Sequence, residues 1–183
     1  MKRGLALGCI FSAGIFLAAC QNNSMMMPNV FGPRLTDGQI VNDIMVADKG
    51  EVANASIAKK RAVSCKVRHF AEQLYNAHGK CLQKISGFAK RNGIKPEDSY
   101  YASEVKSYFD NDKSFLEASP RQDFDKNYVN SEIREHQHAL QFLDRAIRDS
   151  SNPALTEKLK KARMHVANHL ARAQEIKKEM GWY

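Results

Sequence analysis

The sequence lacks the patterns that mark β-structure. It has no sustained alternation of apolar and polar residues, no β-hairpin pattern and few clusters of β-branched residues. Its main apolar stretch, from Leu5 to Leu17, is also shorter than the ~20 residues that a membrane-spanning helix needs. These absences predict an all-α protein without a transmembrane helix.

Motifs of several common catalytic sites are absent as well. The chain contains no Gly-Xaa-Ser-Xaa-Gly elbow, no phosphate-binding loop, no dinucleotide fingerprint and no paired-cysteine zinc knuckle. The sequence therefore gives no support for a serine hydrolase, a nucleotide hydrolase or a dehydrogenase.

The amino terminus is typical of an exported protein. A positively charged start precedes the apolar stretch, and the small residues before Cys20 resemble the lipobox of bacterial lipoproteins. We expect residues 1–19 to be a signal peptide and Cys20 to be lipidated, so that lipid anchors the protein to a membrane. An ordinary secretory leader with an incidental cysteine is the alternative. Gln21, where retention at the inner membrane usually needs Asp, favours the outer membrane, facing the periplasm, as the location in the cell envelope.

The four cysteines have different expected fates. Cys9 leaves with the leader and Cys20 carries lipid, which leaves Cys65 and Cys81 in an oxidising compartment. On one continuous helix these two would lie roughly 24 Å apart, far beyond the ~7 Å that a disulfide tolerates. We therefore expect Cys81 to be a buried free thiol and Cys65 to be exposed. Neither has a positioned base, so neither is expected to be a nucleophile.

The remaining chain predicts a tether followed by one domain. Residues 20–35 mix polar residues with Gly and Pro, and residues 36–183 suffice for a single core. The formal net charge is +8, but an exported protein is not expected to bind nucleic acid. The basic clusters at 59–61 and 158–163 predict solvated helix faces, with anionic lipid as the alternative partner. The sequence does not identify any protein partner.

Apolar periodicity and capping residues predict four long helices and one shorter helix. Two short turns and one long connection join the long helices, which favours a ferritin-like four-helix bundle of two antiparallel hairpins. The shorter helix would form the crossover. The first three expected helices run from Thr36 to about Arg61, from near Ser64 to before Gly93, and from about Glu97 to Glu117. The fourth begins between Pro120 and Asp123 and ends near Ser150, and the fifth runs from Asn152-Pro153 to Gly181.

Each long helix carries one candidate metal ligand on its apolar stripe and near its midpoint. In a bundle of equal antiparallel helices, these residues fall within about one turn of the same layer. Three imidazoles and a carboxylate would suit zinc, iron, manganese or copper. The candidates are Glu51, His78, His136 and His169.

Two further residues lie one turn from these histidines. Glu132 precedes His136 and His165 precedes His169, and each is a candidate for an extra ligand or a supporting group. The alternative is a hydrogen-bonded polar layer that fixes the register of the bundle without metal. His69 and His138 fall off the stripe and are expected in solvent.

Three stretches of the chain also resemble a known family. "VRHFAEQLYNAHGKCLQKISGFAKRNGIKP", "FDKNYVNSEIREHQHAL" and "VANHLARAQEI" resemble bacterial envelope proteins of domain-of-unknown-function family 4142, over about residues 36–180. The resemblance implies a secreted or lipid-anchored protein with a ferritin-like bundle. Its histidines match His78, His136 and His169, and its first-helix glutamate matches Glu51. Its Phe-Asp-x-x-Tyr run matches Phe124, Asp125 and Tyr128, which adds Asp125 and Tyr128 as supporting groups.

The chain also departs from that pattern. Ala77 replaces an acidic residue frequent in members, and His165 is an additional imidazole. The di-iron signature, Glu three residues before His on two helices, is missing because Tyr75, Ile133 and Val166 occupy those positions. Oxidase chemistry is therefore not supported.

We therefore expect a lipid-anchored envelope protein that binds a metal ion or small ligand at a central His/Glu site. The alternative is a non-catalytic interaction or stress-protection module whose polar layer is structural. A metal-dependent redox enzyme would additionally need an open coordination position.

Overall fold

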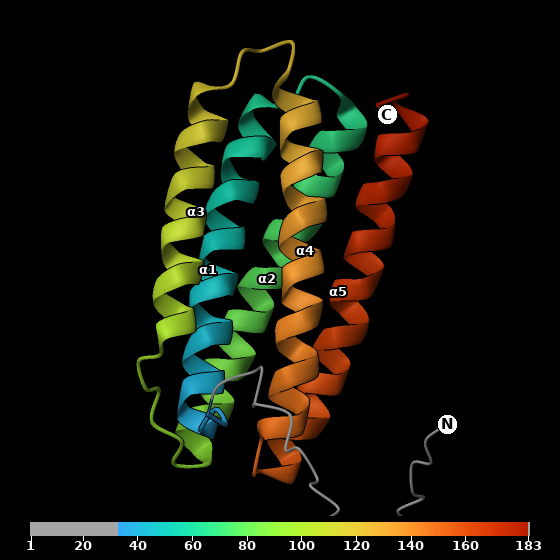
Figure 1. The fold of residues 1–183 in the computed structure, drawn as a ribbon. Coiled ribbons are helices and arrows are strands. Elements are labelled where there is room, and N and C mark those ends of the chain that lie inside the picture. Colours follow the sequence, from blue (N-terminus) through green and yellow to red (C-terminus); the bar gives the residue numbers. More distant parts are fainter. Residues whose placement is uncertain (1–32, 183) are drawn as a thin grey trace, which may run out of the picture. The chain divides into compact units, whose positions relative to one another are not determined.

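In the computed structural model, residues 33–182 are described, and they form five α-helices and no strand (Figure 1). The all-α class is thus confirmed for this part of the chain. The expected signal peptide, Cys20 and nearly all of the expected tether lie outside the described residues. None of the helices described combines the length and apolar composition that crossing a bilayer requires.

The first two helices begin where the sequence predicts. α1 spans Asp37–Arg61, and Thr36 and Gln39 form a reciprocal capping box at its start. α2 spans Cys65–Arg91, and the Ser64 hydroxyl accepts a hydrogen bond from the Lys66 N–H. Gly93 follows α2 with a φ of 66°, which glycine adopts at little cost, so the helix ends there.

The third helix begins later than expected. α3 spans Tyr100–Ala118, three residues after the predicted start at Glu97. Glu97 is held outside the helix because its N–H donates to the Gly38 carbonyl and its carboxylate accepts from the Thr36 hydroxyl. Ser99 then caps the helix through the Ala102 N–H. Contacts to the start of α1 therefore shift the boundary.

The last two helices match their predicted bounds closely. α4 spans Phe124–Asp149, and α5 spans Pro153–Glu179 with proline in its first turn. The Asn152 side chain accepts hydrogen bonds from the N–H groups of residues 154 and 155. α5 ends before Gly181, whose φ is 70°.

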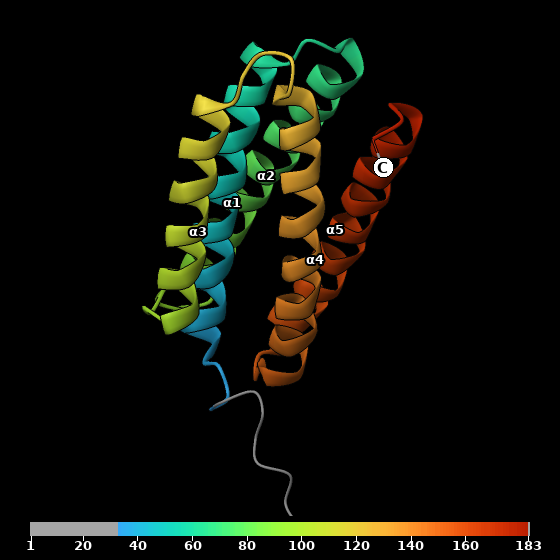
Figure 2. The same ribbon diagram turned by 45° about the horizontal axis from the view of Figure 1, so that its top comes forward.

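The helices pair as two hairpins with α3 between them in sequence. α1 packs along α2, and α4 packs along α5 (Figures 1 and 2). α3 lies along α1 as it returns the chain to the start of α4. Gly50 permits this close packing, because a Cβ there would lie 2.2 Å from the Phe109 ring. The hairpin α1–α2 therefore carries the shorter helix α3 along α1.

Two apolar clusters fill the core, one toward each end of the bundle. One gathers around Phe70, Leu74, Phe124 and Val129, and the other around Ile40, Phe88, Leu143 and Leu159. Along each long helix, the predicted ligand lies between residues of the two clusters. The polar residues thus form a layer at mid-height, as the sequence predicts.

Candidate metal centre

Three histidines from three helices converge in this layer. His78 comes from α2, His136 from α4 and His169 from α5, and one nitrogen of each lies within 4.8 Å of the others. Their ring centroids are 5.4 to 5.7 Å apart. His136 Nε2 is 3.3 Å from His169 Nδ1, close to the ~3.3 Å between two nitrogens on one tetrahedral zinc ion. This spacing is suitable for a shared metal ion.

Hydrogen bonds fix which nitrogens are free to bind metal. His136 Nδ1–H donates to the Glu132 carbonyl at 2.9 Å, which leaves the lone pair on Nε2. His78 Nδ1 lies 2.8 Å from the Asp48 carboxylate. Since an ionised carboxylate can only accept, this nitrogen donates, and His78 Nε2 is left buried without a partner among the described residues. Carboxylate and carbonyl supports of this kind orient metal-binding histidines.

Burial keeps two of these imidazoles in the neutral form that binds metal. Desolvation, and then the proximity of His78 and His169, lower the pKa of His136 well below its usual value. Burial, followed by repulsion from His78 and His165, lowers the pKa of His169 to about 4. At neutral pH, protons therefore compete weakly for both rings.

The carboxylates lie at the other edge of His136. Its Nδ1 is 3.5 Å from Glu132 Oε2 and 3.7 Å from Glu51 Oε1, and these three residues form a second group of potential ligands. Glu51 is thus separated from His78 and His169 by the His136 ring. This placement corrects the expectation of four ligands around one point, since the helix period predicts the height of Glu51 better than its direction.

Burial also changes the protonation of these carboxylates. Desolvation raises the pKa of Glu132 to about 8. The pKa of Glu51 lies well above its usual value because of burial and the neighbouring charges of Glu132 and Glu135. Without a cation, the folded protein therefore favours the protonated forms.

A hydrogen-bonded network continues from the carboxylates toward α3. Asn54 Nδ2 donates to Asp112 at 2.9 Å and approaches Glu135 at 3.5 Å, and the Ser131 hydroxyl also donates to Asp112. Asp48, Asp112 and Glu135 are buried polar residues that the sequence analysis missed. Asp48 and Glu135 lie one turn from Glu51 and Glu132, a spacing that could have suggested them, whereas nothing local showed which way α3 faces.

The three other residues that the sequence analysis named as supporting groups lie at different distances from the histidines. Asp125 accepts hydrogen bonds from the N–H groups of Val63 and Ser64 at 3.0 and 2.7 Å, so it caps the turn into α2. Since α4 rises about 1.5 Å per residue, Asp125 lies roughly 16 Å from the height of His136, which corrects its expected role beside the metal. Tyr128 is fully buried near Glu132, whereas His165 is exposed.

The off-stripe residues and the thiols agree with the predicted pattern. His69 and His138 are exposed. Cys65 is exposed, Cys81 is partly buried, and both are free thiols. Burial and the nearby Asp48 carboxylate raise the pKa of Cys81, which disfavours a nucleophilic thiolate.

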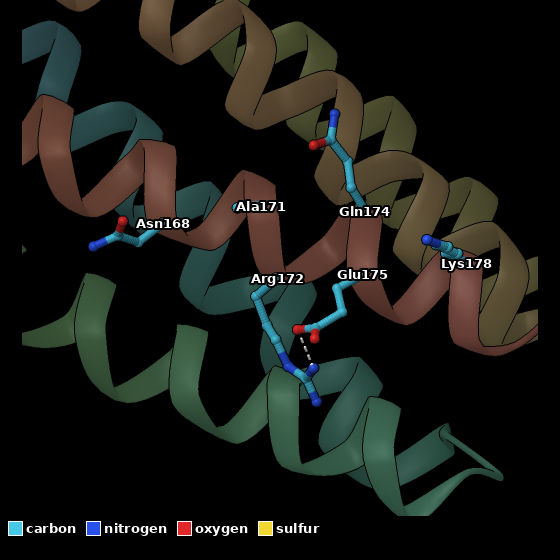
Figure 3. A pocket seen from close by; sticks show the side chains of 6 residues that line it. All are labelled: Asn168, Ala171, Arg172, Gln174, Glu175 and Lys178. Atoms are coloured by element: carbon cyan, nitrogen blue, oxygen red, sulfur yellow. Dashed lines mark hydrogen bonds and ion pairs between the residues drawn. The ribbon is translucent and has the colours of Figure 1, made fainter.

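A hollow on the outer face of α5 does not form a comparable site. Its lining comes from one helix, and an ion pair between Arg172 and Glu175 at 2.5 Å crosses part of it (Figure 3). Because no second element contributes to it, its polar groups do not converge as those of the buried layer do. The other lining residues are Asn168, Ala171, Gln174 and Lys178.

These features define the class of the protein as a helical bundle with a buried layer of imidazoles and carboxylates. The model of the family called Domain of unknown function (DUF4142) matches residues 25–176. The chain belongs to this family, which confirms the resemblance seen in the sequence. A comparison with curated proteins finds no significant match.

Two solved structures share the fold at low sequence identity. A DUF305 fragment from Deinococcus radiodurans has a TM-score of 0.67 and 13% identity, covering 79% of this chain and 97% of that chain. A DUF305 protein from Streptomyces coelicolor, provisionally described as secreted, has a TM-score of 0.67 and 11% identity, covering 78% and 92%. At these identities, the likeness shows a common helical bundle.

Proposed function

We propose that this protein is held at the bacterial cell envelope by lipid on Cys20 and binds one transition-metal ion through His78, His136 and His169. The observation that carries the metal proposal is the buried His78 Nε2, which has no partner among the described residues and faces two more imidazoles. Burying an unpaired polar group is costly, and a shared metal ion would satisfy His78 Nε2 while replacing the 3.3 Å hydrogen bond between His136 Nε2 and His169 Nδ1.

The donor chemistry favours some metals over others. Imidazole nitrogens suit zinc and copper well, and iron also, whereas manganese prefers oxygen ligands. Three protein ligands also leave a fourth coordination position for water or another small ligand. Asp48 and the Glu132 carbonyl would hold two of the rings in the binding orientation. We therefore rank Zn²⁺ and Cu²⁺ first among the four metals expected.

The envelope location has its support in the leader and in the relatives. The charged start, the apolar stretch and the small residues before Cys20 match a lipoprotein leader, and a structural relative is provisionally described as secreted. We propose the outer membrane, facing the periplasm, as the location. Cys20→Ser should release the protein from membranes, and unchanged membrane retention would oppose the lipid anchor.

The helix order supports a ferritin-like topology for this bundle. α1 pairs with α2 and α4 with α5, and α3 provides the long connection that such bundles place between their hairpins. Metal sites of such bundles are built from side chains of facing helices at mid-height. The position of the three histidines agrees with this arrangement.

A structural role for the polar layer is the second candidate function. The network around Asp112 satisfies several buried polar atoms without metal. In that case the protein would serve as an interaction or stress-protection module, and its histidines would only fix the bundle register. Apolar replacement of His136 would then cost little stability, and metal would not raise the melting temperature.

Metal titration of the purified protein tests the two candidates. Isothermal titration with Zn²⁺ should show one site, and the melting temperature should rise with bound metal because metal favours the folded state. His136→Ala should abolish both effects, whereas His138→Ala, an exposed histidine on the same helix, should change neither. A wild-type protein that binds no transition metal would favour the structural role.

A further inference from the structure

The carboxylate side of His136 has features that the histidine site does not explain. Glu132 is completely buried, and neither of its carboxylate oxygens has a hydrogen-bond partner among the described residues. Glu51 Oε2 and Glu135 Oε2 are likewise buried and without partners. Carboxylates in protein interiors are normally paired, coordinated or protonated, because burying their charge is costly.

A neutral side chain beside the carboxylates supports the presence of a ligand there. Tyr128 is fully buried, and its hydroxyl also has no partner among the described residues. Tyr128 lies one turn before Glu132 on α4, so the two side chains share one face of that helix. The Tyr128 hydroxyl, which is not a carboxylate, is therefore a further buried oxygen without a hydrogen-bond partner beside Glu132.

Positive side chains offer these carboxylates little compensation. Arg134 lies half-exposed, with Nη2 3.6 Å from Asp112, at the outer end of the network. His136 presents Nδ1 to Glu51 and Glu132, but the proton of this nitrogen is already donated to the Glu132 carbonyl. The charge balance at this point thus favours an added cation.

We propose that Glu51 and Glu132 form a second cation site, distinct from the histidine site, that takes a hard divalent cation such as Mn²⁺. This inference extends the metal-binding function proposed above. It rests on that function for the Zn²⁺ ion in the neighbouring histidine site, whereas the carboxylate site is argued from its own residues. Tyr128 and Glu135 lie close enough to support the carboxylates. The His136 ring stands between the two sites, with Nε2 on one side and Nδ1 on the other.

The geometry and the donor atoms agree with such an ion. One carboxylate oxygen of Glu51 and one of Glu132 lie within 4.8 Å of each other, and oxygens on opposite sides of a Mg²⁺ or Ca²⁺ ion are about 4–5 Å apart. Oxygen donors suit magnesium, calcium and manganese, whereas imidazoles suit zinc and copper. The two sides of His136 would therefore select different metals.

Sequential loading of the whole purified protein tests the second site. The histidine site is first filled with one equivalent of Zn²⁺, and Mn²⁺ is then added while the electron paramagnetic resonance signal of free Mn²⁺ is followed. The wild-type protein should remove one equivalent of Mn²⁺. Glu132→Gln and Glu51→Gln should each weaken Mn²⁺ binding at least tenfold and leave Zn²⁺ binding unchanged. Asp144→Asn, which removes a partly exposed carboxylate of α4 that pairs with Arg163 instead of facing the carboxylate cluster, should bind Mn²⁺ like the wild type.

A further variant separates the two proposals. His78→Ala should lose Zn²⁺ but still take up Mn²⁺, and this uptake should still depend on Glu132. If no protein binds Zn²⁺, the histidine proposal fails while a Glu132-dependent Mn²⁺ site still stands. Mn²⁺ binding that is absent in the wild type, or equal in the wild type and both Gln variants, would overturn the second site. Circular dichroism would confirm that each variant is folded.

Discussion

The two sides of α4 bury polar groups of opposite electrostatic character. Toward α2 and α5, imidazoles meet around His136 Nε2, and toward α1 and α3, carboxylates meet around Nδ1. Burial lowers the pKa of His136 and His169 but raises that of Glu51 and Glu132. The same desolvation therefore prepares the first side to bind metal at neutral pH and makes the second hold protons until a cation replaces them.

This contrast gives the metal-free protein two opposite sensitivities to pH. A histidine with a lowered pKa stabilises the fold above its unfolded pKa of about 6.5, and that stability is lost as the pH falls. A carboxylate with a raised pKa stabilises the fold below its unfolded value, and that stability is lost as the pH rises through its folded pKa. We therefore expect the free energy of unfolding to decrease toward both acid and alkali.

The largest expected effect comes from replacing Glu132, whose ionisation lowers the free energy of unfolding at alkaline pH. Glu132→Gln should raise the free energy of unfolding of the metal-free protein, relative to the wild type, by more at pH 9 than at pH 5. The gain should amount to several kcal/mol, because the pKa rises from 4.5 to about 8 and each unit corresponds to about 1.4 kcal/mol. Urea unfolding at the two pH values would measure it. An equal change at both pH values would show that Glu132 ionises as freely in the folded protein as in the unfolded chain.

A smaller effect should show whether Asp48 orients His78 for Zn²⁺ binding. Asp48→Asn keeps the shape but removes the charge that accepts from His78 Nδ1, so Zn²⁺ affinity should fall by about tenfold or more. Asp43→Asn is the matched control, because Asp43 is a buried aspartate of the same helix that bonds Ser99 instead. Titration calorimetry would compare them, and equal Zn²⁺ affinities would argue against orientation of His78 by Asp48.

The last variant tests how tightly α3 packs against the carboxylate side. Gly50→Ala would push Cβ against the Phe109 ring, which should cost about 1–3 kcal/mol of stability. Gly79→Ala, with nothing within 4 Å of the added Cβ, should instead stabilise α2 by roughly 0.5–1 kcal/mol. Thermal unfolding of both variants provides the measurement. A Gly50→Ala protein as stable as the wild type would show that α3 is loosely packed.

Local signals predicted the helices well and the site in part. The Thr36 capping box, the Ser64 cap and Gly93 set their helix ends through nearby residues, so the sequence was sufficient there. The start of α3 was missed because Glu97 bonds to α1, which is distant in sequence.

Helical periodicity predicted the height of the buried polar layer, but it did not predict that imidazoles and carboxylates lie on opposite edges of His136. The apolar stripes indicated correctly that His78, His136 and His169 converge. α1 contacts α2, α3 and α4, so buried polar residues occur on several of its faces, and its stripe could not show that Glu51 faces the opposite edge of His136. Asp48 was missed although it lies one turn from Glu51, and Asp112 was missed because nothing local showed which way α3 faces.

X-ray absorption at the zinc edge of the Zn²⁺-loaded protein tests the central claim most directly. We predict three imidazole nitrogens at about 2.0–2.1 Å, a loss of imidazole scattering in His78→Ala and His169→Ala, and an unchanged spectrum in His138→Ala. A zinc ion bound without imidazole ligands, or a spectrum that responds to His138 as it does to His78, would contradict the account.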